Sequence, residues 1–182
     1  MTVRRFLDGL YLGAGVLAGV FLIIIFALMM VMSVGREIGL NIPAGDDFAS
    51  WCMAAMAFLG LAYTFRSGEM IRVGLLIDRF EGRRRWFFEM FALILGVGFS
   101  VFFAIHAAKL TWESWRFNDM AQGVLAIPLW IPQLGYAGGL IILAIAMVDE
   151  LVHVARGGDP RYEKPKPQTA EEAVQRAIES AV

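Results

Sequence analysis

Four stretches of the chain contain no Asp, Glu, Lys or Arg, and this absence of charge is the first constraint on its fold. The stretches are 9–35, 48–65, 90–108 and 120–148, which are 27, 18, 19 and 29 residues long. A hydrocarbon core of about 30 Å needs about 20 helical residues. With 58% hydrophobic residues and a mean hydropathy of +0.62, an ordinary soluble domain is excluded. The sequence predicts an all-α integral membrane protein with four transmembrane helices.

Other scarcities exclude whole classes of site. Cys52 is the single cysteine, so one chain can form neither a disulfide nor a thiolate metal site. A net charge of −1 gives no basic field for nucleic acid. The two histidines, His106 and His153, fall at opposite membrane depths and cannot both ligate one haem iron. Phosphate loops, HExxH and GxSxG motifs do not occur. We therefore expect no enzymatic activity, no metal and no cofactor.

No predicted span carries an ionisable residue near its centre. Such residues are costly in the hydrocarbon core and usually mark the path of an ion or a substrate. Paired breaks of the kind that form transporter binding sites are also missing from the four spans. We therefore expect that this chain has no transport pathway of its own.

The basic residues predict the orientation of the chain. The amino-terminal segment, the segment 66–85 between the second and third spans, and the residues from Arg156 onward hold 13 of the 16 Lys and Arg residues. By the positive-inside rule, these parts and both termini are predicted to be cytoplasmic. The tryptophans agree with this orientation, because 51, 112, 115 and 130 fall at the outer boundary and 86 at the inner one.

Helices are predicted at about 6–33, 47–65, from 86 past the membrane, and from the prolyl segment near 128 to about 152. The first is read as an uncleaved helix because its apolar run is too long for a signal peptide. Residues 1–156 would form the transmembrane domain. Residues 157–182 would form a polar cytoplasmic tail that is partly disordered, with a short helix at 170–181 after a capping box.

Three local patterns leave two interpretations open. The pairs Gly9–Gly13 and Gly15–Gly19 have GxxxG spacing, which suits close helix contact but also reflects the abundance of glycine in membrane helices. Segment 66–85 could form an interfacial helix that either holds a partner subunit or anchors to anionic headgroups. The third helix carries a strip of polar residues that is either a binding surface or a solvated face with an i,i+4 ion pair; its members are His106, Lys109, Glu113 and Arg116.

Two separated motifs resemble a known family. Gly68-Glu69-Met70-Ile71-Arg72-Val73-Gly74 is similar to the Gly-Glu-His-Ile-Arg-Val-Asp segment that follows the second helix of DctQ-type small membrane subunits of tripartite ATP-independent periplasmic (TRAP) transporters. Ile127-Pro128-Leu129-Trp130-Ile131-Pro132, followed by Gln133, is similar to the segment before their fourth helix. Asp47 matches the acidic residue that opens their second helix. Met70 and Gly74 depart from the pattern, so no histidine or aspartate role is carried over to those positions. The likeness covers about residues 5–155.

The resemblance implies a bacterial inner-membrane complex. A periplasmic substrate-binding protein would capture an organic acid, and a large multi-span subunit would transport it with sodium. This chain would be the small, non-enzymatic scaffold subunit, in contact with that large subunit and with membrane lipids. The candidate contact residues are Asp47, Gly68, Glu69, Arg72, Pro128, Trp130, Pro132 and Gln133. The alternatives are a haem- or quinone-associated anchor of a redox enzyme and the small subunit of a tripartite tricarboxylate transporter.

Overall fold

Four long helices make up most of the chain in the computed structural model, which describes residues 2–39, 42–67 and 83–157. They are α1 (Thr2–Glu37), α2 (Gly45–Ser67), α4 (Arg83–Arg116) and α5 (Trp130–Ala155). Each is long and apolar enough to cross a membrane. The predicted all-α fold with four transmembrane helices is therefore confirmed. The expected interfacial helix and the tail helix lie outside the described residues.

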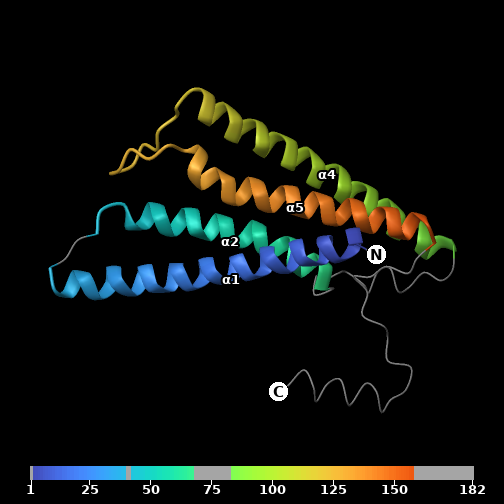
Figure 1. The fold of residues 1–182 in the computed structure, drawn as a ribbon, viewed down its shortest axis with the longest axis horizontal. Helices are drawn as coiled ribbons and strands as arrows, with labels where there is room; N and C mark the ends of the chain where they lie inside the picture. The colour runs from blue at the N-terminus through green and yellow to red at the C-terminus, as the bar shows by residue number, and fades with distance from the viewer. Residues whose placement is uncertain (1, 40–41, 68–82, 158–182) are drawn as a thin grey trace, which may run out of the picture.

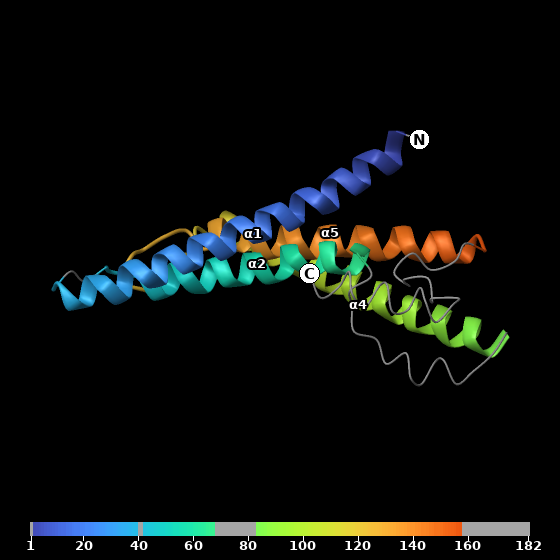
Figure 2. The ribbon, with the colours of Figure 1, turned by 90° about the horizontal axis from the view of Figure 1, so that it is seen from below.

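The helices lie side by side in a row, in the order α1, α2, α5, α4 (Figure 1). α2 packs against both α1 and α5, and α5 packs against α4, whereas α1 meets α5 only briefly. Seen at right angles, the row is thin, and α1 and α4 diverge to opposite sides at the end where α1 begins (Figure 2). The described part of the chain is thus a flat array with two edge helices.

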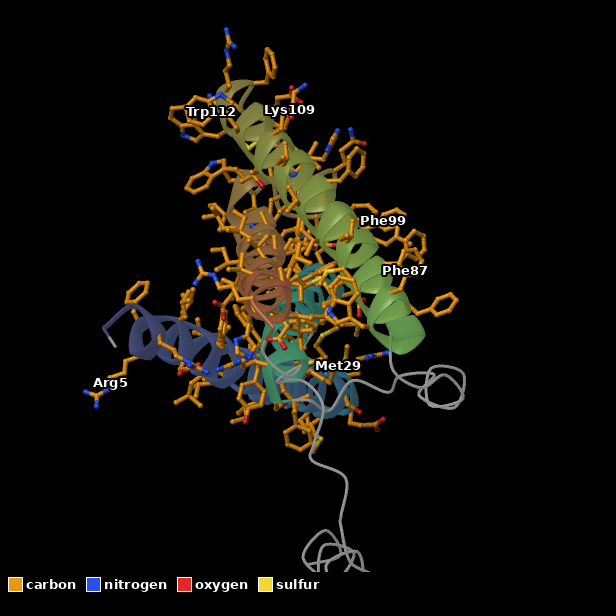
Figure 3. All side chains as sticks on the ribbon, turned by 90° about the vertical axis from the view of Figure 1, so that its right-hand side faces the viewer. Arg5, Met29, Phe87, Phe99, Lys109 and Trp112 are labelled. Atoms are coloured by element: carbon orange, nitrogen blue, oxygen red, sulfur yellow. The ribbon has the colours of Figure 1, made fainter. Side chains whose placement is uncertain are left out.

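The edge helices are the most exposed elements. In the most apolar 18-residue window of each span, 6% of the α1 residues and 18% of the α4 residues are buried, compared with 44% for α5. Large apolar side chains on α1 such as Ile23 and Phe26 are 68% and 66% exposed. On α4, Phe87 and Phe99 project outward from the array (Figure 3). Because these surfaces are apolar, lipid or another membrane protein must cover them.

Small residues form the contact between the two central helices. A Cβ added at Gly139 of α5 would lie 2.5 Å from the Phe58 carbonyl carbon of α2, and one at Gly135 would lie 2.6 Å from the Ala55 Cβ. Gly135 and Gly139 have GxxxG spacing, which allows two helix backbones to approach closely in a membrane. Glycine therefore lets the backbones of α2 and α5 approach closely at this contact.

The two GxxxG pairs singled out on α1 do not form such a contact with the other described helices. A Cβ at Gly9, Gly13 or Gly19 would meet nothing within 4 Å. Gly15 alone is close to a neighbour, because its Cβ would fall 2.7 Å from the Tyr63 ring of α2. α1 instead packs through Tyr11, Ala14 and Ala18, which share one buried face.

Local backbone structure at the helix ends explains most differences between the observed and the predicted helix bounds. α1 continues to Glu37 and is followed by Gly39 at φ 76°, a backbone conformation that suits glycine. α2 begins at Gly45, two residues before the predicted start, so Asp47 lies inside its first turn. Both Asp46 and Asp47 still place negative charge where the helix dipole favours it. α4 ends with Asn118 at φ 53° and a hydrogen bond of 3.0 Å from the Asp119 N–H to the Ser114 carbonyl, as in a Schellman motif.

Candidate functional site

The described family-motif residues gather at one end of the array. Asp47 lies in the first turn of α2, while Pro128, Trp130, Pro132 and Gln133 lie just before or within the first turn of α5. α2 and α5 begin at the same end of the array, where α1 and α4 finish (Figure 1). The structure therefore brings the Asp47 position and the prolyl motif together. The other three candidate residues, Gly68, Glu69 and Arg72, fall outside the described residues.

A short hairpin between α4 and α5 connects these motif residues. Met120 and Pro128 form an antiparallel bridge, and the Ala121 N–H donates to the Ile127 carbonyl at 2.8 Å. The tip of the hairpin approaches α2, because a Cβ at Gly123 would collide with the Asp47 carboxylate. Asp47 is thus held between the start of its own helix and a loop that is distant in sequence.

The prolyl segment fixes the start of α5. Pro132 occupies the first turn of the helix, where its missing N–H would have had no intrahelical partner. The Gln133 N–H donates to the Leu129 carbonyl at 3.2 Å. The Gln133 side chain turns inward, and its Oε1 is buried with no hydrogen-bond partner among the described residues. Burial of an unpaired amide oxygen is costly, so this position is a candidate for a polar contact.

Trp130 and Pro132 face two different grooves. Pro132 lines an apolar groove of about 250 Å³ between α2 and α5, which also includes Phe48 and Trp51. Trp130 lines a second groove of about 330 Å³ between α4 and α5, which we call the α4–α5 groove. The alternation follows from helical geometry, because residues two positions apart point to opposite sides of a helix.

Polar contacts also connect the helices at the opposite end. The Arg66 guanidinium of α2 donates to the Asp8 carboxylate of α1 at 2.9 Å. Next to this ion pair, Tyr11 is only 1% exposed and packs in one cluster with Ala62, Phe65 and residues of α5. In the sequence, Arg66 contributes only to the predicted orientation of the chain. No spacing in the sequence identifies Asp8 as its partner.

The polar strip on α4 has the geometry of a solvated face. Lys109 and Glu113 form an i,i+4 pair at 3.7 Å, with side chains that are 70% and 45% exposed. The Nδ1 atom of His106 lies 2.9 Å from the Phe102 carbonyl of the preceding turn. Across the described residues, no three His, Cys, Asp or Glu side chains come close enough to hold a metal ion.

Such an array defines a class of protein: a multi-pass, all-helical membrane protein that exposes broad apolar faces. The family model of the DctQ component of tripartite ATP-independent periplasmic transporters matches residues 23–157. The chain belongs to this family, and it is a component of a transporter of that type. Comparison with curated proteins and with solved structures finds no match.

Proposed function

We propose that this chain is the small scaffold subunit of a bacterial inner-membrane transporter that takes up organic acids together with sodium. The family membership supports the place in a tripartite system. The observation that carries the scaffold role is the flat array, in which α1 and α4 are edge helices with mostly exposed apolar surfaces. One of these surfaces would hold a large multi-span subunit that binds and moves the solute.

Charge supports an orientation with both termini in the cytoplasm. Arg4, Arg5, Arg66 and Arg156 lie at one end of the described helices, whereas only Arg36, Lys109 and Arg116 lie at the other. The prolyl motif, the hairpin 119–129 and the start of α2 would then face the periplasm. A substrate-loaded periplasmic protein would dock at this end, near Asp47 and Trp130.

Cysteine labelling tests the orientation. Cys52 is replaced by alanine, a single cysteine is introduced at Asn118 or at Arg156, and intact cells are treated with a membrane-impermeant maleimide. The label should reach Asn118→Cys from outside and Arg156→Cys only after lysis. The reverse pattern would overturn the proposed topology without affecting the family assignment.

Reconstitution tests the scaffold role. The chain is purified alone and with its proposed large subunit, and each preparation is placed in liposomes with the periplasmic protein and a labelled C4-dicarboxylate, keto acid or sugar acid. We expect sodium-driven uptake only when the large subunit is present. Uptake by this chain alone would refute the scaffold proposal.

A further inference from the structure

The α4–α5 groove is a second candidate binding site, distinct from the helix faces discussed above. Its walls are three tryptophans, Trp112 and Trp115 from α4 and Trp130 from α5. Its floor contains Ala108 and Gly138, and a Cβ at Gly138 would meet nothing within 4 Å. The groove is thus a space of about 330 Å³ with aromatic walls and a floor of small residues.

The shape of the groove is fixed by contacts between its two helices. The Tyr136 side chain of α5 lies near the side chain of Thr111 on α4, which lines the groove. The Thr111 hydroxyl also donates to the Ala107 carbonyl at 2.9 Å. The rings of Trp112 and Trp115 lie against each other, with centroids 5.1 Å apart. Contacts within α4 and between α4 and α5 thus define the sides of the groove.

Along α4, the groove extends from the membrane interface into the hydrocarbon core. The deep end of the groove lies at Ala108, which is the last residue of the uncharged run 90–108. The shallow end is formed by tryptophans, which prefer the membrane interface. From 108 to 115 the helix rises by about 10 Å. A molecule in the groove would therefore extend from the headgroup level into the acyl-chain region.

A cation stands at the shallow end. Arg116 follows Trp112 by one helical turn and so lies above it on the same side of α4. Its guanidinium contacts the Phe117 ring at 5.9 Å and forms no ion pair within the described part of the chain. Lys109, which belongs to the same polar strip of α4, is instead paired with Glu113 at 3.7 Å. Arg116 is therefore the cation available to an anionic group at the mouth of the groove.

We propose that the α4–α5 groove binds one phospholipid, with an acyl chain against Gly138 and the three tryptophans and the phosphate at Arg116. An arginine fork matches the geometry of phosphate oxygens, and tryptophan N–H groups suit the carbonyl and phosphate region. An acyl chain gains no hydrophobic free energy by leaving bulk lipid. Selective binding therefore depends on the fixed walls and on the phosphate contact. In the proposed orientation this lipid belongs to the periplasmic leaflet, but the site itself does not depend on the orientation.

The tryptophans provide the assay. In the full-length chain with Trp51 and Trp86 changed to phenylalanine, Trp112, Trp115 and Trp130 are the only remaining indoles. Phosphatidylglycerol with brominated acyl chains is titrated into the detergent-solubilised protein, and bromine quenches indole fluorescence on contact. We expect quenching that saturates at a low lipid-to-detergent ratio. Quenching that only rises in proportion to the lipid would mean bulk contact and would overturn the site.

Two substitutions at glycines with open surroundings test the location. Gly138→Leu places a side chain in the groove without a backbone clash, and it should weaken the saturable binding about tenfold or more. Gly98→Leu on the exposed surface of α4, where a Cβ also meets nothing within 4 Å, is the matched control and should not change it. Circular dichroism checks that both variants keep their helices. A Gly138→Leu curve identical to that of the parent would refute the assignment.

The phosphate contact is tested separately. Arg116→Gln should weaken phosphatidylglycerol binding about two- to fivefold, because an exposed charge pair contributes little more than this. Brominated diacylglycerol, which lacks the phosphate, should bind the parent and the variant equally. If Arg116→Gln has no effect on phosphatidylglycerol, the headgroup assignment is wrong. If the co-purified large subunit abolishes the quenching, that subunit occupies the groove and the lipid proposal is wrong.

Discussion

The sharpest test of the packing is Gly139→Ala in α5. A Cβ at this position would lie 2.5 Å from the Phe58 carbonyl carbon and 2.6 Å from the Leu59 backbone nitrogen of α2, where ordinary contacts are 3.4–4 Å. Backbone atoms of a helix cannot rotate away as a side chain can, so α2 and α5 must separate by nearly 1 Å at this level. Overpacking of this kind costs about 1–3 kcal/mol. The loss of folding stability should be large because α2 and α5 form the centre of the array.

The neighbouring glycine provides the control. Gly138→Ala has the same gain in helix propensity, up to about 1 kcal/mol, but its Cβ meets nothing within 4 Å. The difference between the two variants therefore isolates the clash. Unfolding in mixed micelles of increasing dodecyl sulfate fraction, followed by circular dichroism, should show Gly139→Ala less stable than Gly138→Ala by about 1–3 kcal/mol. Equal midpoints for the two variants would refute the packing argument.

Three further predictions concern side chains on α1 and α4. Asp8→Asn should lower the free energy of unfolding by about 0.2–1 kcal/mol, because the Asp8–Arg66 pair is partly exposed. In a chain that already carries Arg66→Gln, Asp8→Asn should lower it almost no further. Additive losses in the same unfolding assay would argue against a direct pair. Tyr11→Ala should cost about 3–5 kcal/mol by leaving a cavity at a side chain that is 1% exposed. Phe99→Ala, at a side chain that is 63% exposed, should change the stability of the isolated chain by less than about 0.5 kcal/mol, and a loss as large as that of Tyr11→Ala would show that the exposed edge of α4 is misassigned.

The number and type of the helices could be predicted from the sequence because the hydrocarbon core acts on each segment separately. A run such as 9–35 is long and uncharged, and that alone identifies a span. The ends were less accurate, because they depend on local backbone choices. Two examples are the left-handed conformation of Asn118 and the start of α2 at Gly45. A hydrophobic pattern predicts neither of them.

The lateral order of the helices could not be predicted in the same way. In lipid, an apolar side chain can face another helix or an acyl chain at little difference in free energy, so hydropathy does not identify the buried face. Glycine spacing was the available signal, but it occurs on both α1 and α5. Gly135 and Gly139 make the close contact, while Gly9 and Gly13 stay open. The choice between them depends on the complementary surface of α2, which a single helix sequence does not describe.

The motif residues were predicted as a set, and the structure separates their surroundings. Asp47, Trp130 and Pro132 lie at the same end, but Trp130 and Pro132 line grooves on opposite sides of α5. A single partner surface placed on one side of the array would touch only one of them. A molecule that approaches the end of the array could reach the hairpin next to Asp47 without entering either groove.

If the proposals above are right, these positions divide the array into surfaces with separate tasks. The apolar edges α1 and α4 can contact a partner or lipid along the whole membrane depth, the end with the hairpin is available to a soluble partner, and the α4–α5 groove reaches only part of the way into the membrane. A substitution that fills the groove, such as Gly138→Leu, should therefore change lipid binding without changing which large subunit co-purifies. Substitutions along the exposed face of an edge helix should have the opposite effect. The two kinds of variant together distinguish a chain that recognises its partner and its lipid by different faces from one in which a single face does both.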